Sequence, residues 1–360
     1  MKSAIVFCRL ILFIAGASSL IGCATMATPA STLAPNTNPT PSPIPTPLPP
    51  PSPTPPPQIQ SLVYVEDDTH TDFARILGYP ISATGPTSFT LNMGDATHSL
   101  SKVSLDSAGN IYVLSSNPKN NEQAILEYSS AWPLTTPVRV LPVGPGTKIP
   151  SVSGLTVSPA GEIFVIDGTG LSVFSATATG SADPERHITS SLPLSSVSVD
   201  INDNAYVTVY GSDTAIVVYG PTANGNASPI RALGGNLTQL NGGYLGGIAT
   251  DSTGDLYVAC ICANVFGVLE FGPSADGNTA PVRTIAGPHT GMYPYFASLG
   301  VAVDSDGYLY VNAIKANATP QYSLPAIFKF SPTASGDAAP DSVVTLDDWY
   351  DSEGSQIAVH

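Results

Sequence analysis

An eleven-residue pattern that recurs along the chain limits the fold more than any other feature. It contains an apolar strand, a tight turn, and a second strand that ends in an aromatic residue followed by valine. Alternating apolar residues on both sides of such a turn are typical of a β-hairpin. Repetition at intervals of 42 to 53 residues indicates one supersecondary unit that is used many times. The copies lie at 103–113 (VSLDSAGNIYV), 155–165, 197–207, 248–258 and 301–311.

The turn inside this hairpin accounts for its acidic residues. In four copies an aspartate enters the turn, where its side chain can accept hydrogen bonds from the backbone a few residues on. The copy at 155–165 has Ser158 instead. Asp304 begins a short stretch that is similar to the start of a calcium loop, but no glutamate follows at the required spacing. We therefore interpret these acids as turn residues, namely Asp106, Asp200, Asp251 and Asp304.

A second motif follows each hairpin. A strand ends in an aromatic residue, a turn containing Pro or Gly comes next, and a last strand completes the unit, as in 216–233, 268–285 and 327–344. Four strands per unit correspond to one blade of a β-propeller. The aromatic position of the hairpin occurs six times, which predicts six blades: Tyr64, Tyr112, Phe164, Tyr206, Tyr257 and Tyr310.

The two ends of the repeating region complement each other. Residues 62–65 (LVYV) match a second hairpin strand that has no first strand before it, and residues 357–360 (IAVH) match the missing first strand. Pairing of the N-terminal and C-terminal strands would close the ring and cover both free sheet edges. The sequence thus predicts an all-β fold, a six-bladed β-propeller over residues 58–360.

The residues before the propeller indicate export. Residues 1–22 combine a positive end with an apolar run at 11–21 that is too short to span a bilayer, as in a signal peptide. The segment ends in Leu-Ile-Gly-Cys, which resembles the bacterial lipobox. The resemblance implies a lipoprotein signal peptide, a lipidated Cys23, and an exported chain anchored in the outer membrane, facing the periplasm or the cell surface. Ordinary signal cleavage near Ala24 or Ala27 is the alternative.

A proline-rich segment separates Cys23 from the propeller. Residues 29–57 contain 14 of the chain's 35 prolines. Proline fixes φ and lacks an N–H donor, so this segment cannot form a helix or a sheet. We expect residues 23–57 to be a disordered stalk, extended as polyproline II at ~3.1 Å per residue. Binding to a proline-recognising module, or threading through cell-wall polymer, are alternatives.

Two of the hairpins, 247–258 (GIATDSTGDLYV) and 300–311 (GVAVDSDGYLYV), resemble the core of the NHL repeat. The resemblance extends over about 300 residues with its weaker copies and implies the propeller fold. Members of this class include protein-binding scaffolds, a peptide-amidating lyase and calcium-dependent hydrolases of the gluconolactonase and paraoxonase type. The calcium ligands of those hydrolases have no matching motif here, so the resemblance favours a binding module over an enzyme.

We expect function on the face that carries the loops between blades and between second and third strands, because those loops vary in sequence. The opposite face carries nearly identical turns. Exposed Trp and Tyr beside carboxylates would suit a carbohydrate or a protein partner, although these rings could equally pack between blades. The candidates on the variable face are Asp67, Asp68, His70, His98, Lys119, Asn120, His289, Tyr293, Tyr295, Phe296, Asp347, Asp348, Trp349, Tyr350 and Asp351.

The charge and the ionisable residues limit the chemistry further. A formal net charge of −15 makes nucleic-acid binding improbable. Asp68, His70, His98 and Asp347 could converge on a metal ion, but their spacing does not require it. A Ser-His-Asp triad stays open because its members need not be adjacent in sequence, although no G-x-S-x-G motif is present. We assign no catalytic residue, metal site or cofactor.

Cys260 and Cys262 lie two positions apart at a strand end. Alternate residues of a strand point the same way, so the pair could form a disulfide or hold a soft metal in an oxidising compartment. We favour two small, half-buried thiols.

These observations predict a membrane-anchored, non-catalytic propeller for ligand or protein binding at the cell envelope, with an envelope protein or a carbohydrate as its partner. The alternative is a metal-dependent propeller hydrolase or lyase similar to the lactonases, with Ca²⁺ or Zn²⁺ at the central opening.

Overall fold

The chain is nearly all β. The computed structural model describes residues 62–67, 75–86, 91–93, 98–117, 119–130, 136–211, 214–262, 265–292, 300–315, 324–345 and 356–360. Helix is confined, in these ranges, to two single turns of 3-10 helix, η1 (Asn236–Thr238) and η2 (Pro288–Thr290). Neither is long or apolar enough to cross a membrane. The all-β prediction is confirmed.

Five sheets each contain four consecutive antiparallel strands, which is the arrangement of a propeller blade. We call them blades A to E in chain order. Blade A is β5 (Ser99–Leu105), β6 (Ile111–Asn117), β7 (Glu122–Tyr128) and β8 (Arg139–Val143). Blade B is β9 (Gly154–Val157), β10 (Ile163–Ile166), β11 (Gly170–Phe174) and β12 (Arg186–Thr189). Blade C is β13 (Leu194–Val199), β14 (Ala205–Val209), β15 (Thr214–Tyr219) and β16 (Arg231–Gly234). Blade D is β17 (Tyr244–Thr250), β18 (Leu256–Cys262), β19 (Val265–Phe271) and β20 (Arg283–Ala286). Blade E is β21 (Gly300–Val303), β22 (Leu309–Lys315), β23 (Leu324–Phe330) and β24 (Ser342–Thr345).

The remaining sheet is assembled from both ends of the repeating region. It contains, in spatial order, β25 (Ile357–Val359), β1 (Leu62–Asp67), β2 (Arg75–Pro80) and β4 (Leu91–Asn92). β25 and β1 are antiparallel, with Ala358 opposite Tyr64, so the predicted joining of the two ends is confirmed.

The blade count differs from the prediction. The structure has five regular blades rather than six, because the closing sheet is not formed from consecutive strands and its outer strand β4 has only two residues.

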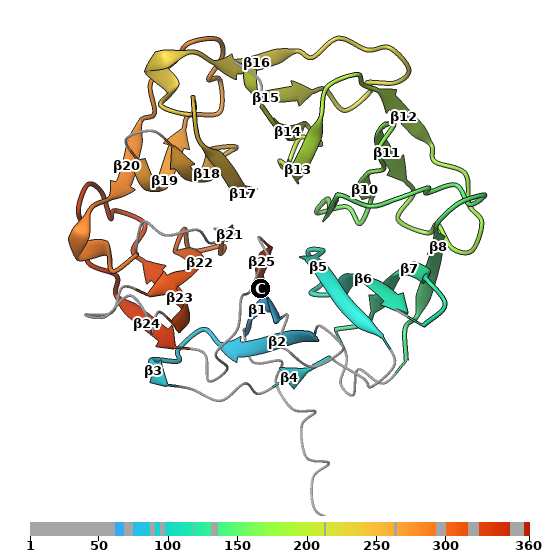
Figure 1. Ribbon diagram of the computed structural model, residues 1–360, viewed down its shortest axis with the longest axis horizontal. Coiled ribbons are helices and arrows are strands. Elements are labelled where there is room, and N and C mark those ends of the chain that lie inside the picture. The colour runs from blue at the N-terminus through green and yellow to red at the C-terminus, as the bar shows by residue number, and fades with distance from the viewer. Residues whose placement is uncertain are drawn as a thin grey trace, which may run out of the picture. The chain divides into compact units, whose positions relative to one another are not determined.

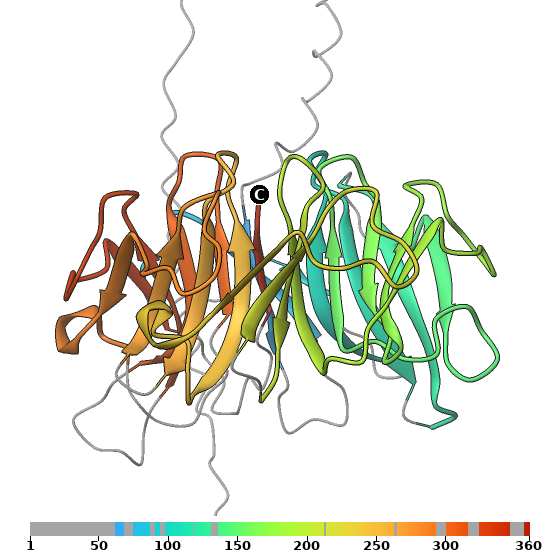
Figure 2. The same cartoon turned by 90° about the horizontal axis from the view of Figure 1, so that it is seen from above.

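The sheets surround a central opening (Figure 1). The innermost strands β5, β9, β13, β17, β21 and β25 contact one another in this order around the axis. Figure 2 shows the blades edge-on, with the chain end marked C on one side of the ring. His360 and the hairpin turns between first and second strands border the same cavity, so we call this side the turn face. The opposite side, which carries the other loops, is the loop face.

The core lies between neighbouring sheets. Each of six hydrophobic clusters joins side chains of two adjacent sheets, as when Tyr206 of blade C packs with Leu256 and Phe271 of blade D. The aromatic residue of each hairpin in blades A to E is almost completely buried. Burial of a side chain of this size contributes about 1.5–3 kcal/mol. The repeated aromatic therefore contributes a packing contact between neighbouring sheets throughout blades A to E.

The repeated aspartate belongs to a polar clasp that joins one blade to the next. In blade C, Asp200 Oδ1 accepts hydrogen bonds from the backbone N–H groups of Asn202 and Asn204, both at 2.9 Å. Its Oδ2 accepts the Tyr206 hydroxyl at 3.3 Å. Arg231 donates to the Tyr206 oxygen at 2.8 Å and to the Pro273 carbonyl of blade D. The interpretation of these aspartates as turn residues is confirmed.

The same clasp occurs in blades A and D. There the aspartates are Asp106 and Asp251, and Arg139 and Arg283 reach backbone carbonyls of the following blade. Blade D differs in one bond, because Arg283 donates to Glu270.

Blade B shows why Asp and Tyr occur together. It has Ser158 in place of the aspartate and Phe164 in place of the tyrosine. A phenylalanine has no hydroxyl to donate, so a carboxylate at this buried position would lose one of its partners. Ser158 Oγ still accepts the Glu162 N–H at 3.2 Å, which preserves the turn. The two departures from the pattern therefore compensate each other.

The second motif also joins neighbouring sheets. Gly277 of blade D adopts φ +61° and donates its N–H to the Ala232 carbonyl of blade C at 2.8 Å, while its own carbonyl accepts from Gly234 at 3.1 Å. The closing sheet makes the same contact with blade E through β3 (Gly85–Pro86), which pairs with Val344. These turns fix the spacing between sheets and thereby hold the loop face in place.

Candidate functional site

The structure describes few of the candidates from the variable face. Lys119 and Asn120 lie in the exposed turn between β6 and β7, and His98 and His289 also lie in described segments. Of Asp67 only the backbone is described, as the last residue of β1. The other candidates lie outside the described residues, so their predicted roles stay predictions: Cys23, Asp68, His70, Tyr293, Tyr295, Phe296, Asp347, Asp348, Trp349, Tyr350 and Asp351.

His289 serves a junction between blades D and E. Its backbone N–H donates to Asp337 Oδ1 at 2.6 Å, and its Nδ1 lies 2.5 Å from Asp337 Oδ2. Desolvation acts to raise the pKa of Asp337, but the hydrogen bonds from His289 lower it overall. Asn278 accepts the equivalent backbone bond from Leu237 at the junction of blades C and D. His289 and Leu237 therefore occupy equivalent positions, and the backbone of each has a structural role in its own junction.

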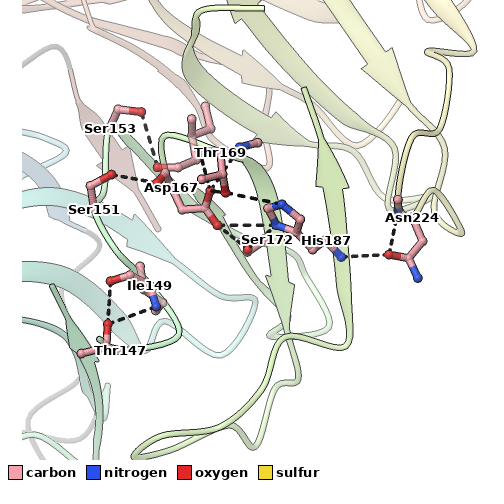
Figure 3. Close-up of polar contacts among 12 residues, drawn as sticks. Thr147, Ile149, Ser151, Ser153, Asp167, Thr169, Ser172, His187 and Asn224 are labelled. Atoms are coloured by element: carbon pink, nitrogen blue, oxygen red, sulfur yellow. Dashed lines mark hydrogen bonds and ion pairs between the residues drawn. The ribbon is translucent and has the colours of Figure 1, made fainter. Parts of the chain in front are cut away.

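A serine, a histidine and an aspartate do come together, in blade B (Figure 3). Ser172 of β11 is directly opposite His187 of β12. Ser172 Oγ lies 2.5 Å from Asp167 Oδ2 and 2.9 Å from His187 Nδ1. In a hydrolytic triad the histidine lies between the serine and the carboxylate and takes the serine proton. Here the serine occupies the middle position, so its proton goes to Asp167.

Burial also excludes Ser172 as a nucleophile. Ser172 is 1% exposed and Asp167 is 2% exposed. Asp167 Oδ1 accepts the backbone N–H groups of Thr169 and Gly170, as well as the Thr169 hydroxyl. The cluster therefore fixes the loop between β10 and β11, and His187 closes it from the solvent side.

A cavity of about 530 Å³ lies on the axis of the ring. It is lined by the innermost strands and by the hairpin turns, and His360 borders it on the turn face. The carboxylates at this end are Asp106, Asp251 and Asp304. Asp304 is representative: it accepts two backbone N–H groups at 3.0 and 2.9 Å and the Tyr310 hydroxyl at 3.0 Å. These carboxylates are therefore occupied in holding their turns.

The walls of this axial cavity are bonded to each other in the same way. Ser104 Oγ accepts the Val157 N–H at 3.0 Å, and Ser198 and Thr250 are joined at 3.1 Å between blades C and D. Gln356, just before β25, donates to the Leu155 carbonyl of β9 at 3.1 Å. These contacts tie the inner strands together across the ring.

A second hollow, of about 280 Å³, lies on the loop face where blade C meets the start of blade D. We call it the tyrosine groove, after Tyr210 in its wall and Tyr244 next to its edge. None of the lining residues that the structure describes is acidic or basic. The lining residues are Ser195, Thr208, Val209, Tyr210, Gly211, Ala215, Leu240, Gly242, Gly243 and Leu245.

The two cysteines lie beneath this groove. A disulfide joins Cys260 and Cys262 in β18, so the interpretation as two thiols was wrong. Both pack in one cluster with Leu240 and Leu245 of the groove. Gly243 lies so close that an added Cβ would be 2.2 Å from the Ile261 carbonyl oxygen and 2.3 Å from Cys262 Cα. Only glycine fits at this position of the groove.

No cluster of three or more His, Cys, Asp or Glu side chains within the described ranges is arranged to hold a metal ion.

Comparison with known proteins identifies no family. No family model matches the chain, and no curated protein matches it either. Among solved structures, a luciferin-regenerating enzyme is 16% identical, with a TM-score of 0.47 over 79% of this chain and 92% of that one. The β-propeller domain of Cps50 (Swd1) from Myceliophteria thermophila is 11% identical, with a TM-score of 0.43 over 72% and 73%. YCF48 bound to a D1 peptide is 13% identical, with a TM-score of 0.42 over 71% and 86%.

These similarities are too low to carry an argument about activity. The sheets themselves define the chain as a β-propeller, and its described site features are an axial cavity with occupied carboxylates and an uncharged groove on the loop face.

Proposed function

We propose that the protein is a membrane-anchored, non-catalytic β-propeller that binds a ligand or a protein at the cell envelope. The closing sheet acts as a sixth blade of an NHL-like ring. Residues 1–22 are the lipoprotein signal peptide, Cys23 carries the lipid, and residues 23–57 are the stalk. The partner is an envelope protein or a carbohydrate, reached from the outer membrane.

The observation that supports a binding role is how the ionisable groups of the axial cavity are used. A general base needs a free lone pair within hydrogen-bond reach of its substrate. Asp106 instead accepts the N–H groups of Ala108 and Asn110, both at 2.9 Å, and the side-chain amide of Asn110 at 2.7 Å. The serine in the Ser172–His187 pair is buried and donates to a carboxylate. The described aspartates of the cavity and this serine thus support the scaffold, and we expect recognition on the variable loop face.

The anchor is tested with a Cys23→Ala variant of the full chain expressed in a bacterium that processes lipoproteins. The wild-type protein should sediment with the membrane fraction and incorporate a labelled fatty acid, while the variant should do neither. A variant that stays in the membrane and remains labelled would show that Cys23 is not the lipidated residue.

The alternative of a metal-dependent hydrolase or lyase is tested by elemental analysis of the purified full-length protein. A binding module should contain no stoichiometric divalent metal after dialysis against buffer without chelator. One tightly held Ca²⁺ or Zn²⁺ per chain, together with turnover of a lactone, would replace the proposal with the enzyme.

A further inference from the structure

We propose that the tyrosine groove is the ligand site of this propeller and that it takes an uncharged saccharide. The proposal rests on the binding role proposed above and specifies where and what the protein binds. The groove has a volume of about 280 Å³. Small-molecule pockets usually measure about 300–1,000 Å³, so the groove suits a small ligand or one or two units of a longer chain.

The surroundings of the groove suit stacking against a ring. Tyr210, in the groove wall, is 66% exposed, and Tyr244, between the lining residues Gly243 and Leu245, is 44% exposed. The Tyr210 N–H donates to the Pro193 carbonyl at 2.9 Å, and Leu192, the residue before Pro193, is a further exposed apolar residue. Exposed tyrosines offer an apolar face together with a polar tip, which is the combination that the C–H face and the hydroxyls of a sugar require.

The polar groups of the groove are hydroxyls rather than charges. The side chains of Ser195, Tyr210 and Tyr244 make no hydrogen bond with any residue in the described part of the chain. Each hydroxyl can both donate and accept, as sugar hydroxyls also do. Thr208 differs, because its Oγ1 already accepts the Ser196 N–H at 2.8 Å.

The described lining residues carry no charge, which selects against ionic ligands. The chain carries a formal net charge of −15, so its surface repels anions in general. A cation would find no carboxylate among the groove's described residues to pair with. Against the described lining, an uncharged ligand is therefore the one that binds without a desolvation penalty for an unpaired charge.

A peptide added as an extra β-strand fits less well. That mode of binding needs an exposed sheet edge with free backbone groups. The outer strand of blade C, β16, is covered by Gly277, whose backbone bonds to both Ala232 and Gly234. Backbone pairing with a peptide is thus blocked at this edge, which leaves side-chain and ring contacts as the means of recognition.

The test uses the full-length protein in detergent and isothermal titration. The probes are maltotriose, cellotriose and N,N′,N″-triacetylchitotriose as neutral trisaccharides, a trimer of galacturonic acid as a charged one, and an uncharged hexapeptide. At least one neutral trisaccharide should bind, and the charged trimer should bind much more weakly. Tyr210→Ala should weaken binding by about tenfold or more, because stacking on one ring is lost. Tyr210→Phe should retain most of the affinity.

The matched control is Ile201→Ala, which removes a side chain of 60% exposure at the axial cavity on the turn face. It should leave binding unchanged. The inference is overturned if no neutral trisaccharide binds at millimolar concentration, if Tyr210→Ala binds normally, or if Ile201→Ala is the variant that loses binding. If the hexapeptide binds and Tyr210→Ala abolishes that binding, the assignment of a saccharide ligand is overturned, while the proposed binding role itself stands.

Discussion

Replacing Tyr206 by phenylalanine should weaken the junction between blades C and D. The change removes one oxygen from a buried clasp. That oxygen donates to Asp200 Oδ2 at 3.3 Å and accepts from Arg231 at 2.8 Å. Burial raises the pKa of Tyr206, so the hydroxyl stays protonated and keeps both roles at neutral pH.

The expected loss can be estimated from the partners that remain. Asp200 is 3% exposed and would keep its other hydrogen bonds, including one from the Asn204 amide at 2.9 Å. Arg231 would keep the Pro273 carbonyl and its position 5.3 Å from the ring centroid. Leaving a buried group short of one partner costs ~1–3 kcal/mol, and the bond that Tyr206 donates to Asp200 is long, at 3.3 Å. We expect Tyr206→Phe to lower the free energy of unfolding by about 2 kcal/mol.

Blade B supplies the second half of this experiment. The double change Asp200→Ser and Tyr206→Phe reproduces its pair Ser158 and Phe164. Because the carboxylate that needs the hydroxyl is then absent, the double variant should lose about 1 kcal/mol less than the sum of the two single variants.

The measurement is equilibrium unfolding in urea followed by circular dichroism. Tyr219→Phe is the matched control, since Tyr219 is 3% exposed in the same blade and its hydroxyl bonds to no described residue. That control should change stability by less than about 0.5 kcal/mol. Equal losses for Tyr206→Phe and Tyr219→Phe, or strictly additive single variants, would refute the clasp as an energetic unit.

Three further predictions concern single contacts. Hydrogen bonds from His289 lower the pKa of Asp337 in the folded chain, so the stability they add is present above the ordinary aspartate pKa and is lost as pH falls through the lowered value. Asp337→Asn should therefore reduce the loss of thermal stability that the wild type shows in melts between pH 5 and pH 2. The Cys260–Cys262 disulfide closes a ring over a single intervening residue. The double variant Cys260→Ala and Cys262→Ala should therefore lower the free energy of unfolding by less than the ~3 kcal/mol expected for a disulfide that closes a 15-residue loop. Alkylation of the denatured wild type before reduction should label neither of these two cysteines. Gly277 has φ +61° with open space around the position that a Cβ would take. Gly277→Ala should therefore lower the free energy of unfolding in urea by about 1–2 kcal/mol, and Gly277→Asn should lower it by less. Equal stability of the wild type and both variants would contradict the need for a residue that tolerates the left-handed conformation.

The regular blades could be predicted because they repeat local signals. Each hairpin has an Asp or Ser at the turn and an aromatic residue opposite, and these residues act within a few positions of each other. The closing sheet was harder to describe from sequence. Its second motif, which contains Ala83 and Gly85, has the same spacing as the other turns but is followed by a strand of only two residues. The pairing of the two ends was predictable because an unpaired strand needs a partner.

The sites were less accessible from sequence. Ionisable residues in variable loops are the signal that a sequence offers, whereas the described lining of the tyrosine groove consists of Tyr210, Gly243 and other uncharged residues that no motif distinguishes. Ser172 and His187 come together only through the register of β11 and β12, which a sequence does not specify without the turn geometry. The prediction of two thiols was wrong because alternate residues of a strand point to the same side, which brings Cys260 and Cys262 together.

The pairing of β25 with β1 has a consequence for biosynthesis. The two strands are separated by about 300 residues, so the last hydrogen bonds of the ring must wait until nearly the whole chain has left the ribosome. On the proposed export route, they form after passage through the inner membrane. Until then one edge of β1 remains open to other chains, so prematurely terminated products should aggregate or be degraded rather than persist as smaller rings.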